Sequence, residues 1–299
     1  MLDLFRAAPH VRMHLGQTMV IKVGGVCLAK PSLMRGVVKQ VAAVQALGAQ
    51  VVLVHGGGPQ TDAVQRMLGE EPQMIDGRRV TTPKALQALR MATAGELHSD
   101  IVAALAREGA PAVGVSAASA GVLVAKKRPP VTTSSGVVDF GAVGDVQSVD
   151  PAPLRALLDA GQMPVLCPPA SDGAGGVLNV NADVTAAALA AGLGASKLVF
   201  LTGAAGVLRD PADANSLFSS LSLAELAELG EEGALAKGML VKATAIATAL
   251  ESGVDRAHVV SGLDPEALLV ELYTTSGAGT LITTEKEELT TAVSEGAFA

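Results

Sequence analysis

The stretch IKVGG, residues 21–25, closes an apolar run with a lysine and a pair of glycines. A related stretch, VHGGGPQ at residues 54–60, closes the next apolar run. Glycines directly after a strand let backbone N–H groups crowd around an oxyanion, because no Cβ blocks the approach. A helix that begins just beyond such a turn adds partial positive charge at its N-terminus. Two such turns, together with Lys22 and Asp183, indicate phosphoryl transfer rather than nucleotide storage.

Short apolar runs alternate with longer helical patterns along the whole chain. We expect strands at residues 19–23, 51–54, 112–116, 164–167, 197–201, 258–261 and 280–282. We expect helices at residues 32–47, 83–107, 150–160, 182–192, 223–229, 239–252 and 265–273. Because strand–helix alternation builds parallel sheets, the predicted fold is α/β: a three-layer αβα sandwich around a mostly parallel central sheet.

One segment breaks this alternation. Residues 122–149 are rich in Val, Gly and β-branched residues, and they predict an antiparallel ribbon across the main sheet that could serve as a lid. Ser171–Gly176 is typical of a loop tip, and we place the seam between two lobes there. The predicted parts are an N-terminal helix at 1–17, an N-terminal lobe at 18–175 and a C-terminal lobe at 176–299. The tail at 283–299 is expected to be solvated and frayed.

The composition excludes several classes of protein. The chain has 299 residues, a net charge of −7 and only 2% aromatic residues, which argues against nucleic-acid partners. No apolar run approaches the ~20 residues of a membrane span, and residues 1–17 lack a signal-peptide hydrophobic region. We therefore expect a cytoplasmic protein without a membrane partner. Cys27 and Cys167 lack metal-ligand spacing, and no metal site is expected.

Two lysines and two arginines are the candidate cationic groups. Phosphoryl transfer needs positioning and charge neutralisation, and Lys22 lies where a strand meets the first glycine turn. Lys242 lies near the start of a predicted helix, where a cation opposes the helix dipole unless an anion offsets it. For both, an exposed surface lysine is the alternative. Arg78 or Arg79 could clamp a carboxylate with its guanidinium fork, and a solvated arginine at a helix entry is the alternative.

A third turn joins amide and carboxylate side chains. Asn179, Asn181 and Asp183 alternate along the chain, so an extended segment would place them on one face. That face could bind a polar substrate and orient two lysines. The alternative is a run of Asx turns that caps the alanine-rich helix after it.

Seven segments together resemble the amino-acid kinase superfamily, and within it the family of N-acetyl-L-glutamate kinases of arginine biosynthesis. In chain order they are IKVGG (21–25), VHGGGPQ (54–60), DGRRVT (76–81), FGAVGDV (140–146), LNVNAD (178–183), LTGAAGVL (201–208) and KGMLVK (237–242). The resemblance covers almost the whole chain and implies the amino-acid kinase fold. It also implies ATP-dependent phosphorylation of the γ-carboxylate of N-acetyl-L-glutamate, with Mg²⁺ carried by the nucleotide.

The resemblance also implies roles for individual residues. The catalytic set would be Lys22, Lys242 and Asp183, with the lysines on either side of the phosphoryl group and the aspartate holding both. The backbone cradle for phosphate would be Gly24, Gly25 and Gly57. The substrate would contact Gly57, Gly58, Arg79, Asn179 and Asn181, with Arg79 on its α-carboxylate. The nucleotide would contact Thr202, Gly203, Gly206, Val207, Leu208, Gly238 and Met239. No general base is needed, because a carboxylate is already ionised at pH 7.

Lobe functions and partners follow from the same resemblance. The N-terminal lobe would bind substrate and dimerise, and the C-terminal lobe would bind nucleotide. Residues 1–17 resemble an extra helix that links dimers into a hexamer, beside which arginine binds as an inhibitor. The alternative for this segment is an ordinary helix packed on its own subunit. We expect a homo-oligomer that is at least a dimer and acts on small-molecule substrates.

The sequence departs from the family pattern in three places. Gly203 stands where aspartate is usual, residues 116–121 replace a glycine–lysine–aspartate–glycine turn, and asparagine is common near His98. Two other functions stay open. One is a kinase for an N-blocked or carrier-linked α-aminoadipate in lysine biosynthesis, in which Lys126-Lys127-Arg128 would meet the carrier. The other is a non-catalytic sensor of arginine or nucleotide.

Overall fold

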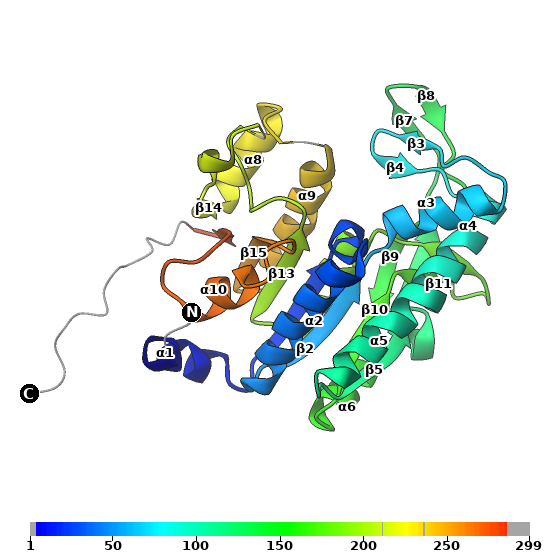
Figure 1. The fold of residues 1–299 in the computed structure, drawn as a ribbon. Coiled ribbons are helices and arrows are strands. Elements are labelled where there is room, and N and C mark those ends of the chain that lie inside the picture. The colour runs from blue at the N-terminus through cyan, green and yellow to red at the C-terminus, as the bar shows by residue number, and fades with distance from the viewer. Residues whose placement is uncertain (1–3, 211, 236, 286–299) are drawn as a thin grey trace, which may run out of the picture.

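A computed structural model describes residues 4–210, 212–235 and 237–285 of the chain (Figure 1). All structural statements below concern these residues. The predicted frayed tail began at 283, but Thr283 is the buried last residue of a strand, and residues 286–299 lie outside the described residues.

The core of the fold is an eight-stranded sheet with the order β14-β16-β15-β13-β1-β2-β10-β5. Every neighbouring pair is parallel except β15–β16, which confirms the mostly parallel sheet. All the predicted strands lie in it, and β14 is an addition. The bounds are β1 (Thr18–Val23), β2 (Gln50–His55), β5 (Ala112–Ser116), β10 (Met163–Cys167), β13 (Lys197–Thr202), β14 (Ser220–Ser222), β15 (Arg256–Ser261) and β16 (Thr280–Thr283).

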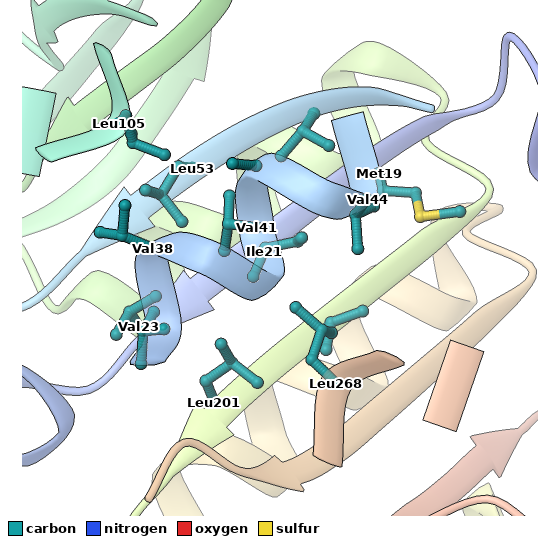
Figure 2. Close-up of a cluster of buried hydrophobic side chains, with 14 of the residues drawn as sticks. Met19, Ile21, Val23, Val38, Val41, Val44, Leu53, Leu105, Leu201 and Leu268 are labelled. Carbon is teal, nitrogen blue, oxygen red and sulfur yellow. The ribbon is translucent and has the colours of Figure 1, made fainter. Parts of the chain in front are cut away.

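Helices cover both faces of this sheet, which confirms the three-layer sandwich. Because side chains alternate along a strand, Met19, Ile21 and Val23 of β1 enter one hydrophobic cluster while Val20 enters the other. The first cluster, drawn in Figure 2, packs against α2, α5 (Leu97–Arg107) and α10. The second packs against α6, α7, α8 and α9. The bounds are α2 (Pro31–Ala46), α6 (Ala152–Asp159), α7 (Ala182–Leu193), α8 (Leu223–Glu231), α9 (Lys237–Glu251) and α10 (Ala267–Tyr273).

The bounds of the predicted helices shift by up to two residues, and two of the differences have a clear cause. The helix expected at 83–107 is a rod of α4 (Pro83–Leu89), the π-helical turn η2 (Arg90–Glu96) and α5 (Leu97–Arg107). Thr82 caps α4, since its hydroxyl accepts from Ala85 N at 3.0 Å. Helix α2 begins one residue earlier than expected, because Pro31 occupies its first turn and Lys30 is the cap.

The predicted ribbon is part of a second sheet with the order β12-β11-β6-β9. Its antiparallel pair is β6 (Leu123–Lys127) and β9 (Gly144–Val149), and it continues into β11 (Pro169–Ser171) and β12 (Val177–Asn179). The expected loop tip at 171–176 is the turn of hairpin β11–β12, closed by Asp172 N donating to Gly176 O. The predicted boundary between lobes therefore falls inside a hairpin, and the large sheet includes strands from both sides of that boundary.

Several elements were absent from the sequence prediction. Helix α3 (Gly58–Met67) follows the second glycine turn, and two hairpins lie beyond it. They are β3–β4 (Met74–Ile75 and Arg78–Arg79), which was not predicted, and β7–β8 (Val131–Thr133 and Gly136–Val138), an antiparallel pair inside the predicted ribbon; the two lie side by side in Figure 1. Asp76 joins their tips by accepting from the Ser134 backbone N–H and hydroxyl at 3.0 and 2.8 Å. The one-turn helices are η1 (Gly25–Leu28), η3 (Ser119–Gly121) and η4 (Ala214–Ser216).

The predicted N-terminal helix is present as α1 (Leu4–His14). It packs on α10, where His14 Nε2 donates to Leu272 O at 2.8 Å and its ring meets Tyr273 edge-on. Phe5 on the same helix is 92% exposed. Among the described helices, none has both the length and the apolar character needed to cross a bilayer.

Candidate functional site

The two glycine turns meet at the carboxyl ends of β1 and β2. The strands pair in register from Thr18↔Gln50 to Val23↔His55, so their turns begin at the same level. A Cβ on Gly25 would lie 2.9 Å from Pro59 Cδ and 3.0 Å from Gly58 N. Only glycine allows this approach, so the two turns form one continuous surface.

The backbone donors of the predicted cradle are not equivalent. Gly24 N donates to Leu201 O at 2.9 Å, which ties the end of β1 to β13 and removes this N–H from the predicted cradle. The Gly57 N–H finds no acceptor among the described residues, and Gly57 lines a cavity. Gly25 and Gly57 are therefore the candidates that remain.

The cavity has a volume of about 710 Å³ and gathers most of the predicted site. Its lining includes Lys22, Gly24, Gly25, Gly57, Gly58, Arg78, Arg79, Arg128, Asn179, Asn181 and Asp183. Residues from the first turns of α9, among them Leu240 and Thr244, close one side. The sequence segments that come together here span almost the whole chain.

Lys22 and Asp183 line this cavity, and they form a buried cluster with Lys242, which is not among the lining residues. Asp183 Oδ1 lies 2.6 Å from Lys22 Nζ and 3.1 Å from Lys242 Nζ, so one carboxylate oxygen holds both ammonium groups. The three residues are 9, 8 and 7% exposed in the order Lys22, Asp183, Lys242. Lys242 Nζ also lies 4.4 Å from the centre of the Phe200 ring, a cation–π distance. The alternative of exposed surface lysines is wrong for both.

The charges of this cluster favour the binding of an anion. Burial, reinforced by the charge of Lys22, lowers the pKa of Lys242 to about 8. Burial alone would raise the pKa of Asp183, but the two ammonium groups outweigh it and hold the pKa below its usual value. Two cations therefore share one compensating charge in a desolvated place, and an arriving anion would relieve the imbalance.

Arg79 is held by residues that sequence reasoning missed. Its guanidinium pairs with Asp62, donates to Gln65 Oε1 at 2.9 Å and donates to Gly58 O at 3.3 Å. Asp62 and Gln65 belong to α3, the helix that follows the second glycine turn. Of the two candidate arginines, Arg79 is thus the one fixed at the cavity wall, while Arg78 is exposed.

The third turn divides its residues between two elements. Asn179 ends β12 and donates from Nδ2 to Thr81 Oγ1 at 3.0 Å. Asn181 caps α7, accepting from Asp183 N at 2.7 Å and Val184 N at 3.3 Å. The predicted shared strand face is therefore wrong, because α7 begins between Asn179 and Asp183. Its Asx-cap alternative is right for Asn181, and all three residues still line the cavity.

The predicted nucleotide set lies around the end of β13 and the start of α9. Thr202 Oγ1 accepts from Ala204 N at 3.0 Å and thereby shapes the turn. Val207 is buried and donates from its N to Thr280 Oγ1 at 2.9 Å, and a Cβ on Gly206 would strike Thr280 and Leu217. A Cβ on Gly203 would meet only Val26 Cγ2 at 3.4 Å. Leu208 bridges to Leu217, and Gly238 and Met239 form the first turn of α9.

Metal-binding side chains do not gather at this site. Across residues 4–210, 212–235 and 237–285, no group of three or more His, Cys, Asp or Glu side chains could hold an ion.

The family is shown by the match of residues 17–261 to the model of the amino acid kinase family. The chain belongs to the amino acid kinase family. This amino acid kinase is 41% identical to the acetylglutamate kinase of Myxococcus xanthus, over 95% of this chain and 94% of that one. It is 36% identical to the acetylglutamate kinase of Archaeoglobus fulgidus, over 93% and 97% of the two chains.

Solved structures agree with this membership. The kinase superposes on an N-acetylglutamate synthase from Neisseria gonorrhoeae, complexed with coenzyme A and N-acetyl-glutamate, with a TM-score of 0.82 and 30% identity. The match covers 94% of this chain and 63% of the synthase chain. A carbamate kinase from Giardia lamblia bound to AMP-PNP gives a TM-score of 0.67 at 17% identity, over 91% and 100% of the chains, and supports the fold alone.

Proposed function

We propose that this amino acid kinase phosphorylates the γ-carboxylate of N-acetyl-L-glutamate with ATP, a step of arginine biosynthesis. The observation that carries the proposal is the buried Lys22–Asp183–Lys242 cluster at the junction of two glycine turns. Relatives named acetylglutamate kinase that align over more than nine-tenths of the chain support the choice of substrate. They favour it over the α-aminoadipate and sensor alternatives.

The proposed reaction is a direct transfer between two oxygens. One oxygen of the substrate γ-carboxylate attacks the γ-phosphorus of ATP, an O–P bond forms, and the bond from phosphorus to the β–γ bridging oxygen breaks. The products are an acyl phosphate and ADP. Lys22 and Lys242 neutralise charge on the moving phosphoryl group, and Asp183 fixes both ammonium groups at 2.6 and 3.1 Å. The nucleophile is already ionised at pH 7, so no base is assigned.

The co-substrate is proposed to be ATP with Mg²⁺ bound to its phosphates. Magnesium of this kind keeps several waters and needs few protein ligands, which suits a site without a carboxylate cluster. We assign the nucleotide to the end of β13 and the first turns of α9, and Leu240, Val241 and Thr244 of α9 line the cavity.

Substrate selectivity tests this proposal directly. ADP release is measured with Mg-ATP and, in parallel, N-acetyl-L-glutamate, N-acetyl-α-aminoadipate and free glutamate. We expect selective turnover of acetylglutamate. Preference for the longer acceptor would favour the lysine alternative, and no turnover with any acceptor would favour the sensor or the carrier-linked substrate.

The pKa of Lys242 predicts an alkaline limit to activity. Because this pKa is lowered to about 8, the free enzyme loses the ammonium as pH rises past 8, and kcat/KM should fall there. Bound phosphate favours the charged form, so the corresponding fall in kcat should lie at higher pH. Cys27→Ala is the control. Burial raises the pKa of the Cys27 thiol, so this thiol is not the group that titrates near pH 8, and the variant should keep the wild-type dependence of kcat/KM on pH. A flat kcat/KM from pH 7 to 10 would contradict the role given to Lys242.

Arg79 is proposed to bind the substrate α-carboxylate. Arg79→Lys removes the planar fork and its bonds to Gln65 and Gly58, so the KM for acetylglutamate should rise about 10- to 100-fold. Arg78→Lys is the matched control, since Arg78 also lines the cavity but is exposed, and its KM should change less than threefold. Equal effects of the two substitutions, measured by initial rates, would remove this assignment.

A second cavity supports regulation by arginine. It has a volume of about 210 Å³, lies between α1, α10 and β15, and its lining includes His10, Lys197, His258, Glu271 and Gly277. Glu271 is a buried carboxylate that pairs with His258 Nδ1 at 2.7 Å and accepts from Ala278 N and Gly279 N at 2.8 Å each. We propose that Glu271 faces the arginine guanidinium and Lys197 its α-carboxylate.

Inhibition assays test this regulatory site. Arginine should inhibit the wild type, and Glu271→Gln should raise the inhibitory concentration at least tenfold because the carboxylate charge is lost. Glu266→Gln is the matched control, as Glu266 is exposed at the start of the same helix. Wild-type turnover that does not respond to millimolar arginine would reject the site.

The protein is also proposed to form a homo-oligomer through α1. This helix packs on α10 by one face and leaves Phe5 and Met13 exposed on the surface. Apolar side chains in such a position suit an interface between copies, and sedimentation of a Phe5→Ser variant against the wild type measures it.

A further inference from the structure

A buried histidine and a half-buried one lie directly behind the second glycine turn. His55 ends β2 and is fully buried, and His98 stands in the first turn of α5. Their rings lie 5.2 Å apart between centres, with His55 Nε2 at 2.9 Å from His98 Nδ1. Neither residue has a part in the reaction described above.

The hydrogen bonds determine where the protons lie on both rings. His55 Nδ1 lies 3.1 Å from Gly56 O, and a carbonyl only accepts, so Nδ1 is the protonated nitrogen. Burial lowers the pKa of His55 to about 4, so the ring is neutral at pH 7 and its Nε2 carries no proton. His98 Nδ1 must therefore carry the proton and donate to His55.

The Gly56–Gly57 peptide is the end of this chain of hydrogen bonds. In a planar trans peptide the C=O and the following N–H point in opposite directions. His55 binds Gly56 O, so the Gly57 N–H points away from the histidines. Gly57 lines the large cavity, and its N–H has no acceptor among the residues that the structure describes.

Neighbouring residues pack closely around the glycine turn and around the His98 ring. A Cβ on Gly57 would lie 2.5 Å from Thr93 Cγ2, so the turn packs tightly against η2. A Cβ on Gly114, in strand β5, would lie 2.6 Å from His98 Nε2. A glycine in a strand weakens it, and here its lack of a side chain accommodates the His98 ring.

We propose that His98 is a positioning residue that acts through His55 to aim the Gly57 N–H at the transferring phosphoryl group. This inference rests on the proposed kinase function. The donor contributes only if it is held in place before the charge develops, and His98 and His55 fix the peptide that carries it.

Two substitutions at one position separate this role from packing. His98→Leu fills the space but cannot donate to His55. The kcat with acetylglutamate should then fall about 10- to 100-fold, which does not exceed the fall expected when a whole oxyanion donor is removed. His98→Asn places an amide N–H near the position of Nδ1, and kcat should stay within about threefold of the wild type. The KM for ATP should stay within about twofold in both. Equal kcat values for the two variants would overturn the proposal.

A measurement without turnover keeps the test independent of the proposed function. Long-range ¹H–¹⁵N spectra of the wild-type side chains should show Nδ1 protonated and Nε2 bare on both His55 and His98 at pH 7. Protonated Nε2 on either ring would overturn the proposal whatever the substrate. Gly114→Ala should displace the His98 ring and lower kcat like His98→Leu, and an unchanged kcat in this variant would also count against it. Absence of wild-type turnover with the correct tautomers would instead reject the kinase function.

Discussion

Lys22→Ala is expected to lower kcat about 1000-fold. Lys22 Nζ lies 2.6 Å from Asp183 Oδ1 at the junction of the glycine turns, so alanine removes one of two cations from the transferring group. Removal of a charged or oxyanion donor from a desolvated site costs about 10²–10⁵ in rate. The KM for acetylglutamate should change little, because Arg79 and Asn179 are assigned to substrate binding. Initial rates at saturating ATP measure both constants.

The control for this variant is Lys39→Ala, which removes an exposed lysine from α2 and should leave kcat unchanged. The residual activity of Lys22→Ala should also differ from the wild type in its dependence on pH. With the neighbouring charge gone, the pKa of Lys242 should rise toward its ordinary value, and the alkaline limit of kcat/KM should move to higher pH. A kcat within tenfold of the wild type would contradict the role of Lys22.

Asp183→Asn is expected to lower kcat at least 100-fold and also to destabilise the fold. The substitution keeps the side-chain shape but leaves two buried ammonium groups without their shared carboxylate. Breaking a buried ion pair costs about 3–5 kcal/mol of unfolding free energy when the remaining charge stays. Urea unfolding at pH 6 measures this loss, with Asp159→Asn, an exposed carboxylate on α6, as the matched control.

The loss of stability in Asp183→Asn should become smaller as the pH rises. The wild-type pKa of Lys242 is lowered to about 8, and loss of Asp183 lowers it further because the carboxylate raised it. Between the two pKa values the folded variant binds fewer protons than the folded wild type, so the stability difference shrinks as pH rises toward 8. Above about 8 it should level off. A difference that stays constant from pH 6 to 9 would show that the charge of Lys242 is not coupled to Asp183.

The sheet was predictable from sequence because its strands are short apolar runs separated by amphipathic helices. Helix α3 was missed for a physical reason. Its sequence, GPQTDAVQRM, has few apolar residues, and its buried positions are the polar residues Thr61 and Gln65. Apolar residues therefore do not mark its buried face, and because α3 was missed, the partners of Arg79 were missed with it. A carboxylate one helical turn beyond the glycines, Asp62, was the available signal.

The site itself was predictable in part. Residue type and position made Lys22, Asp183 and Lys242 candidates, the family resemblance joined them in one catalytic set, and the structure places all three together. The face assigned to the 179–183 segment was wrong, because alternation along a sequence does not reveal where Asn181 begins a helix. Gly24 was given a free N–H, and only the pairing of β1 with β13 shows that Leu201 O accepts it.

Product identification tests the central claim most directly. The claim is that the γ-carboxylate of acetylglutamate is itself the nucleophile, held opposite Lys22, Asp183 and Lys242. Mg-ATP, N-acetyl-L-glutamate and hydroxylamine are incubated with the wild type and with Lys22→Ala, and the trapped product is analysed by mass spectrometry. The account predicts the γ-hydroxamate of acetylglutamate, formed in a one-to-one ratio with ADP by the wild type and nearly absent with Lys22→Ala. ADP formation without hydroxamate, or hydroxamate at equal rates from both proteins, would contradict it.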